Sequence, residues 1–363
     1  MLLHVIPTAF DLLVIMLCIG LLATAAWVIP PDMAGVKGLH DDLQHLLGPL
    51  LGALTAMSVI GLLQRSAEMS GRPWGEVFSS LPPVLLETHY GMTWFVRIAS
   101  IIVLWLFWCR RRKHAPRRVA CAMLLAAACL AWTVSASSHG ADWGDFTLAE
   151  WMWSLHIMGA SLWVGSIMIF VLVIRRRLRA QPDRAQALFT ACAGRLSGLA
   201  GMALAVVLIT GAYNAWHQLR HISDLWSSSY GRILLFKLAL VGVMAAIAAF
   251  NRFFTLPLLL HSEGGLLPGQ QTGLALRVLR QWYPSWRPRE AGALARRFAH
   301  GVTVEAWLAL GVLLCAALLA HTMPPKEHAA FPYPKASIGK LKNGPRFDEP
   351  PILSGSKQPR SNC

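Results

Sequence analysis

The chain has 363 residues, of which 55% are hydrophobic and only 14% are charged. A soluble domain carries roughly 25% charged residues, so this composition indicates an integral membrane protein and excludes a soluble domain of ordinary kind. The formal net charge is +15, but most Lys and Arg residues cluster beside apolar runs, a pattern that reflects membrane orientation. We therefore expect the lipid bilayer, and no nucleic acid, as a partner.

Apolar runs long enough to cross a bilayer, which takes about 20 helical residues, recur along the chain. They lie near residues 7–29, 43–63, 91–108, 118–138, 151–174, 194–215, 231–254 and 301–322. The first run lacks a basic n-region and is long for a signal peptide, so we expect an uncleaved span. The sequence predicts an all-α polytopic bundle of eight transmembrane helices over residues 1–322. Residues 323–363 are rich in Pro and Lys and are expected to form an extended tail.

Basic clusters between the apolar runs predict the orientation. Arg and Lys are concentrated in residues 110–118, 175–179 and 277–297. Cytoplasmic connections carry an excess of these residues. Because successive spans alternate in direction, one orientation of the eight spans places all three clusters in the cytoplasm. Both termini are then expected on the outer side.

A short internal repeat links the third and seventh predicted helices. The spacing from Tyr90-Gly91 to Arg97 equals the spacing from Tyr230-Gly231 to Lys237. The repeat favours two parallel four-helix halves related by an axis along the membrane normal.

Charged residues within the apolar runs call for an explanation, because an unpaired charge costs about 2.5–3.5 kcal/mol on insertion scales. For Arg97 and Lys237, we expect the side chains to snorkel outward, because placing the charged group in water costs less free energy than burying it. Near the inner helix ends, Glu305 and Arg252 are expected to pair, either across a transport pathway or as a structural ion pair.

His156 is the one ionisable residue in the apolar run 151–174, and Met152 lies one turn away on the same face. Imidazole is a preferred ligand of copper and zinc, and a thioether adds selectivity for Cu(I). The predicted outer face also holds three histidines at helix ends, with one methionine beside the last of them: His89, His139, His321 and Met323. Polar groups that face a bundle interior tend to be functional, so we expect the four histidines to form one metal site. For each alone, a packing or interfacial role is the alternative, and His4 at the chain end is expected to be solvated.

The seven cysteines are scattered and form no C-x-x-C pair, so neither a disulfide framework nor a thiolate metal site is expected.

Four segments of the C-terminal half occur in a characteristic order: SLHIMGASLWVGSIMIF, TGAYNAW, SSYGRILLFKLALVGVMAAIAAFNRFFTLPLL and VEAWLALGVLLCAALLAHTMPPKEH. Together with AEMSG and THYGMTWFVR in the N-terminal half, they resemble the CopD copper-resistance family of bacterial inner-membrane proteins. The resemblance implies an eight-helix protein that moves copper across the inner membrane, usually inward, from a periplasmic CopC-type copper carrier. It implies metal-binding roles for His156, and for His321 and His328 around Met323. His89 and His139 are added from the predicted topology.

The leading expectation is therefore copper transport or handling through an outer His/Met site, by a protein that is not an enzyme and has both termini in the periplasm. The alternative is an intramembrane b-type haem protein, in which two of the histidines are axial ligands and electrons cross the membrane. A third possibility is an assembly protein that passes copper to a cuproenzyme without transport.

Overall fold

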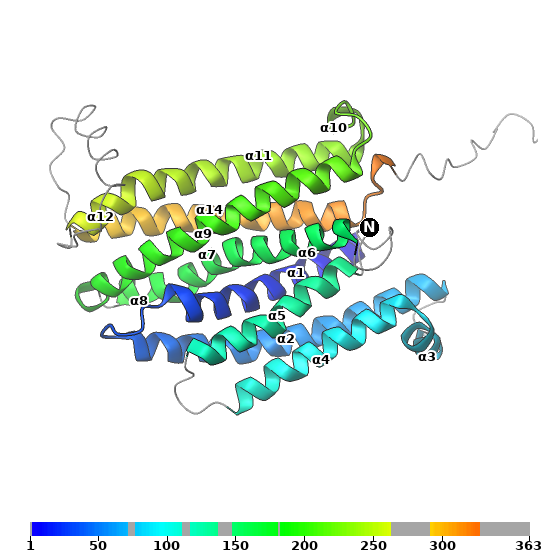
Figure 1. Ribbon diagram of the computed structural model, residues 1–363, viewed down its shortest axis with the longest axis horizontal. Helices are drawn as coiled ribbons and strands as arrows, with labels where there is room; N and C mark the ends of the chain where they lie inside the picture. Colours follow the sequence, from blue (N-terminus) through cyan, green and yellow to red (C-terminus); the bar gives the residue numbers. More distant parts are fainter. Residues whose placement is uncertain are drawn as a thin grey trace, which may run out of the picture.

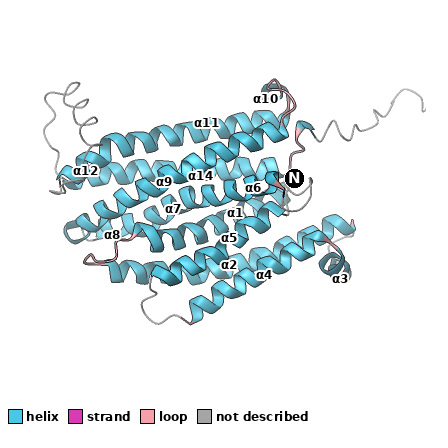
Figure 2. Ribbon diagram, in the orientation of Figure 1, coloured by secondary structure: helices cyan, strands magenta, loops and turns pink. Residues whose placement is uncertain are grey.

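The computed structural model describes residues 2–71, 77–110, 117–136, 147–180, 182–262 and 291–326. Every regular element among these residues is a helix (Figure 2). The helices are α1 (Leu2–Ala23), α2 (Val36–Ser70), α3 (Val77–Glu87), α4 (His89–Cys109), α5 (Arg117–Ala136), α6 (Leu148–Ala160), α7 (Ser166–Ile169), α8 (Arg175–Ala180), α9 (Pro182–Gln218), α10 (Asp224–Ser227), α11 (Ser229–Phe250), α12 (Leu256–Ser262) and α14 (Ala291–Ala320). Short π-helical turns continue several of them at Thr24–Val28, Ser161–Gly165, Phe170–Ile174 and Asn251–Thr255.

Eight helical segments in the described ranges are long and apolar enough to cross a membrane, which confirms the predicted polytopic bundle. They are His4–Val28, Val36–Ser70, His89–Cys109, Val119–Ala136, Leu148–Arg177, Gln186–Gln218, Ser229–Leu260 and Gly292–Ala320. Several exceed the predicted runs by a turn or more, because polar flanking residues continue the helix beyond the apolar core. Most of the predicted tail, from residue 327 on, lies outside the described residues.

The long helices run side by side, and successive spans reverse direction (Figure 1). One end of the bundle carries α3 and α10 and is called the α3/α10 end; the opposite end carries α8 and α12 and is called the α8/α12 end (Figure 1). The first described residues and the end of α14 lie at the α3/α10 end. The arginines of α8, and Arg110 after α4, lie at the other end, as the predicted orientation requires.

Two glycines mark the point where α1 crosses the span that begins with α6. A Cβ added at Gly20 would lie 2.1 Å from the backbone carbon of Gly165, and one added at Gly165 would lie 2.0 Å from the carbonyl oxygen of Met16. Only residues without a side chain allow two backbones to approach so closely. The first helices of the two predicted halves therefore meet backbone to backbone.

The predicted repeat corresponds to the same local structure at the start of α4 and α11. Thr88 and Ser228 are the N-cap residues, and their hydroxyls accept hydrogen bonds from the amides of Gly91 and Gly231 at 3.2 and 2.9 Å. A Cβ added at either glycine would lie 2.1 or 1.9 Å from a carbonyl oxygen of the preceding short helix, α3 or α10. Each half thus folds a short helix against the glycine that opens its third span.

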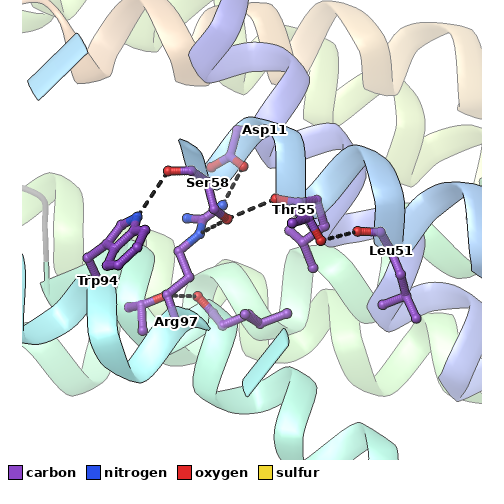
Figure 3. Close-up of polar contacts among 9 residues, drawn as sticks. Asp11, Leu51, Thr55, Ser58, Trp94 and Arg97 are labelled. Atoms are coloured by element: carbon purple, nitrogen blue, oxygen red, sulfur yellow. Dashed lines mark hydrogen bonds and ion pairs between the residues drawn. The ribbon is translucent and has the colours of Figure 1, made fainter. Parts of the chain in front are cut away.

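Arg97 does not snorkel, so that prediction is wrong. Its guanidinium forms an ion pair with Asp11 of α1, and its Nε donates to the Ser58 hydroxyl of α2 at 2.8 Å (Figure 3). Trp94 donates to the backbone carbonyl of Ser58 at 3.0 Å. The Arg97 and Asp11 side chains are only 12% and 21% exposed. An acid on a neighbouring helix makes burial of the arginine cheaper than its extension toward water.

The predicted Glu305–Arg252 pair does not form either. Glu305 of α14 is buried and accepts a hydrogen bond from the Asn251 side chain at 3.0 Å, whereas Arg252 donates to the backbone carbonyl of Ser197 on α9. Adjacent helical residues project about 100° apart. Asn251 therefore faces α14, and Arg252 is directed to a different neighbour.

Candidate metal-binding site

His156 lies on α6 and contacts α9 within the bundle. Its Nδ1 is 3.1 Å from the Thr210 hydroxyl. A Cβ added at Gly211 would lie 3.1 Å from its Cε1, so the glycine provides room for the ring. Trp153, on the preceding turn of α6, makes an edge contact with the imidazole at 6.4 Å between ring centroids. These contacts hold the ring in one orientation.

The Thr210 hydroxyl determines which imidazole nitrogen carries the proton. It donates its single hydrogen to the Val206 carbonyl at 2.6 Å, so it can only accept from His156. Nδ1 of His156 is then protonated, and Nε2 carries a lone pair. The one described side-chain hydrogen bond of His156 is made through Nδ1, and the ring also lies within hydrogen-bonding reach of the Val207 backbone on α9. Metal-binding histidines are typically oriented in this way, through the nitrogen that does not bind the metal.

Three further polar side chains lie on the neighbouring helices α9, α11 and α14. Lys237 of α11 is close enough for its charge to act on His156, and also on Cys315 of α14. Among the described contacts, Lys237 has no ion pair with a carboxylate. Asn214 of α9 is 6% exposed, and neither its Oδ1 nor its Nδ2 has a partner. Helices α6, α9, α11 and α14 therefore contribute polar groups to one region of the second half.

A second polar group lies at the α3/α10 end. Thr8 donates to the His4 carbonyl at 2.9 Å, so the Nε2–H of His321 donates to Thr8 at 2.9 Å. Nδ1 of His4 is 3.1 Å from a carboxylate oxygen of Glu68, and the two imidazole centroids are 6.1 Å apart. Burial lowers the pKa of His321 from its usual value, and the Glu68 charge opposes this effect. The prediction that His4 is simply solvated is therefore wrong.

The other predicted ligands have different positions. His89 is the exposed first residue of α4, Met152 is partly buried one turn before His156, and Met323 is 38% exposed just after α14. His139 and His328 lie outside the described residues. Within the described part of the chain, no three His, Cys, Asp or Glu side chains are arranged to hold a metal ion. His156 and His321 have different neighbours, and convergence of all four histidines in one site stays a prediction.

Sequence reasoning missed Thr210 and Asn214, although both lie in the TGAYNAW segment. Their spacing of four residues places them on one face of a helix, and that spacing was the available signal. Nothing local pointed to Glu68, which reaches His4 from another helix.

Two family profiles match the chain. Copper resistance protein D-like, N-terminal domain, matches residues 3–146, and Copper resistance protein D matches residues 190–319. The chain belongs to the copper resistance protein D family. Membership confirms the resemblance read from the sequence and supports a role in copper handling. Thr210, Asn214 and Lys237 lie within the second matched range, whereas His156 lies between the two ranges.

Three relatives share parts of the family sequence. The chain is 28% identical over 228 residues to the copper transport protein CutJ of Bacillus subtilis (strain 168), which is 60% of this chain and 42% of CutJ. It is 29% identical over 217 residues to Copper resistance protein D of Pseudomonas syringae pv. tomato, 57% of this chain and 67% of that protein. It is 24% identical over 271 residues to the inner membrane protein YebZ of Escherichia coli (strain K12), 70% of this chain and 84% of YebZ. The matched region thus spans less than half the length of CutJ, and no solved structure matches the chain.

Proposed function

We propose that this protein transports copper ions across the bacterial inner membrane, with His156 as an intramembrane ligand. One observation carries the proposal: in a copper-handling family, an imidazole at a helix interface within the bundle is held through Nδ1 by Thr210, which leaves the lone pair on Nε2. A histidine held through one ring nitrogen, with the lone pair kept on the other, is typical of metal-binding sites. The protein is proposed to catalyse no chemical reaction.

The proposed direction is inward, from the α3/α10 end. Arginines gather at the α8/α12 end, which the positive-inside rule places in the cytoplasm. Both termini are then periplasmic, and a separate CopC-type carrier would deliver copper to the end that holds His321 and His4. The inner-membrane location is supported by the eight spans and by the similarity to YebZ, which is described as an inner membrane protein.

Uptake of radioactive copper into vesicles that contain the purified protein tests the proposal. We expect the substitution His156→Ala to lower the initial rate at least about tenfold, since the ion loses a ligand inside the membrane. His300→Ala is the matched control, because His300 is an exposed histidine near the opposite end of the bundle. Equal rates for His156→Ala and the unaltered protein would refute the proposal. Tight copper binding without uptake would instead favour a protein that hands copper to a partner.

The haem alternative has no support from the family or from the described contacts of His156 and His321. Absorption spectra separate the two functions. The copper proposal expects purified protein without a Soret band, and a band lost in the His156→Ala variant would favour haem.

A further inference from the structure

Asn214 is a buried polar side chain without any partner. It is 6% exposed, and both its Oδ1 and its Nδ2 lack a hydrogen bond among the described residues. A buried polar group without a hydrogen bond costs stability. An apolar residue of similar size would avoid this cost. We therefore expect the Asn214 amide to interact with a group other than its protein neighbours.

The helix geometry directs Asn214 toward His156. Thr210, Gly211 and Asn214 share one face of α9, and His156 already contacts the first two. Side chains lean toward the N-terminus of their own helix, and α6 and α9 run in opposite directions. The His156 side chain therefore leans toward the α3/α10 end. Asn214 lies one turn nearer that end than Thr210, and its side chain leans the opposite way, toward His156.

In the first half of the protein, the position equivalent to that of His156 holds a residue with a charged partner. Asp11 precedes the crossing glycine Gly20 by nine residues, and His156 precedes Gly165 by the same nine. The equivalent positions thus hold an acid in one half and an imidazole in the other. In the first half the acid is paired with Arg97.

The third spans complete the comparison. Arg97 and Lys237 each follow the glycine at the start of their helix by six residues. A histidine and a lysine cannot form the ion pair that Asp11 and Arg97 form. The polar groups around His156 therefore retain hydrogen-bonding and metal-binding atoms that no ion pair uses. In the first half, the charges of Asp11 and Arg97 neutralise each other.

We propose that Asn214 is a second ligand of the transported copper ion, binding through Oδ1 opposite Nε2 of His156. This inference rests on the proposed function. An imidazole nitrogen and an amide oxygen are N and O donors of the kind that copper accepts, and Met152, on the same face of α6, is placed to add a thioether. The site lies between α6 and α9, about two turns from the start of α6.

The test is the copper affinity of the full protein in lipid nanodiscs, measured by competition with a chelator of known affinity. Asn214→Leu keeps the volume and removes both polar atoms, and it is expected to weaken binding about tenfold or more. Thr190→Val is the matched control, because Thr190 is also a buried α9 residue whose hydroxyl lacks a partner. Its affinity should equal that of the unaltered protein.

Asn214→His guards against a variant that simply fails to fold. An imidazole at this position would bind beside His156, so the affinity should rise about tenfold, and the spectrum of bound Cu(II) should report one more nitrogen ligand. A gain cannot come from misfolding. If both Asn214 variants bind copper as the unaltered protein does while His156→Ala binds weakly, this inference is overturned and the proposed function stands. If His156→Ala also binds normally, both are overturned.

Discussion

The Thr210 hydroxyl on α9 accepts a hydrogen bond from Nδ1 of His156 on α6, across a helix interface within the bundle. The threonine has no second hydrogen to donate, so it admits one tautomer of the imidazole and leaves Nε2 for a ligand. In the proposed copper site, a residue that does not bind the ion thereby selects the nitrogen that would bind it.

Thr210→Val should weaken copper binding about tenfold, because the ring loses the acceptor that selects its tautomer. Thr210→Ser retains the hydroxyl and should bind within about threefold of the unaltered protein. Thr303→Val is the control, since Thr303 likewise donates to the carbonyl four residues earlier, on α14. The nitrogen NMR shifts of His156 should report a mixture of tautomers only in the valine variant. A single tautomer in that variant would contradict the assigned role of Thr210.

Lys237→Met should tighten copper binding about tenfold. The lysine charge acts on His156, and a nearby positive charge disfavours a bound cation in a medium of low dielectric constant. Lys237→Arg keeps the charge and should bind as weakly as the unaltered protein. Chelator competition measures both, and weaker binding by the methionine variant would mean that the ammonium group assists the site.

The Asp11–Arg97 pair should contribute to stability and not to copper binding. Asp11→Asn leaves a buried arginine without its counter-charge and should lower the free energy of unfolding by about 3 kcal/mol. The double variant Asp11→Leu with Arg97→Met removes both charges and should recover most of that loss. Unfolding in detergent by denaturant provides the measurement. A double variant as unstable as the single one would argue against the pair as the cause.

The lowered pKa of His321 predicts a pH dependence of stability. The pKa of His321 in the folded state is below its value in the unfolded chain. The contribution of the neutral imidazole to the free energy of unfolding is therefore complete above about pH 6.5, and it is lost as the pH falls toward the folded-state pKa. The thermal midpoint should therefore fall between pH 7.5 and 5.5, and His321→Gln should reduce that fall. His221→Gln, in an exposed turn, is the control. An equal fall in the His321 variant would contradict the prediction.

Gly165→Ala should prevent proper assembly of the two halves. Its Cβ would lie 2.0 Å from a backbone oxygen of α1, and neither backbone can yield without moving a helix. Gly52→Ala in α2 meets nothing within 4 Å and should be tolerated. The amount of protein in the membrane and its thermal midpoint test both variants, and normal values for Gly165→Ala would show that the crossing can widen.

The sequence by itself determined the eight spans, since a helix that crosses a bilayer is read from the length of one apolar run. It also identified the repeat, because Tyr90-Gly91 and Tyr230-Gly231 open their helices through local N-cap contacts. His156 was identifiable as an isolated ionisable residue in its span.

The tertiary structure alone decided which side chains meet. Arg97 pairs with Asp11, 86 positions away in the chain, and His156 contacts Thr210, 54 positions away. Glu305 contacts Asn251 although Arg252 is the next residue. Each polar group in an apolar bundle must find its partner on a neighbouring helix, and the rotation and approach of the packed helices select that partner. Helix packing involves residues far apart in the chain, so no local pattern contains this information.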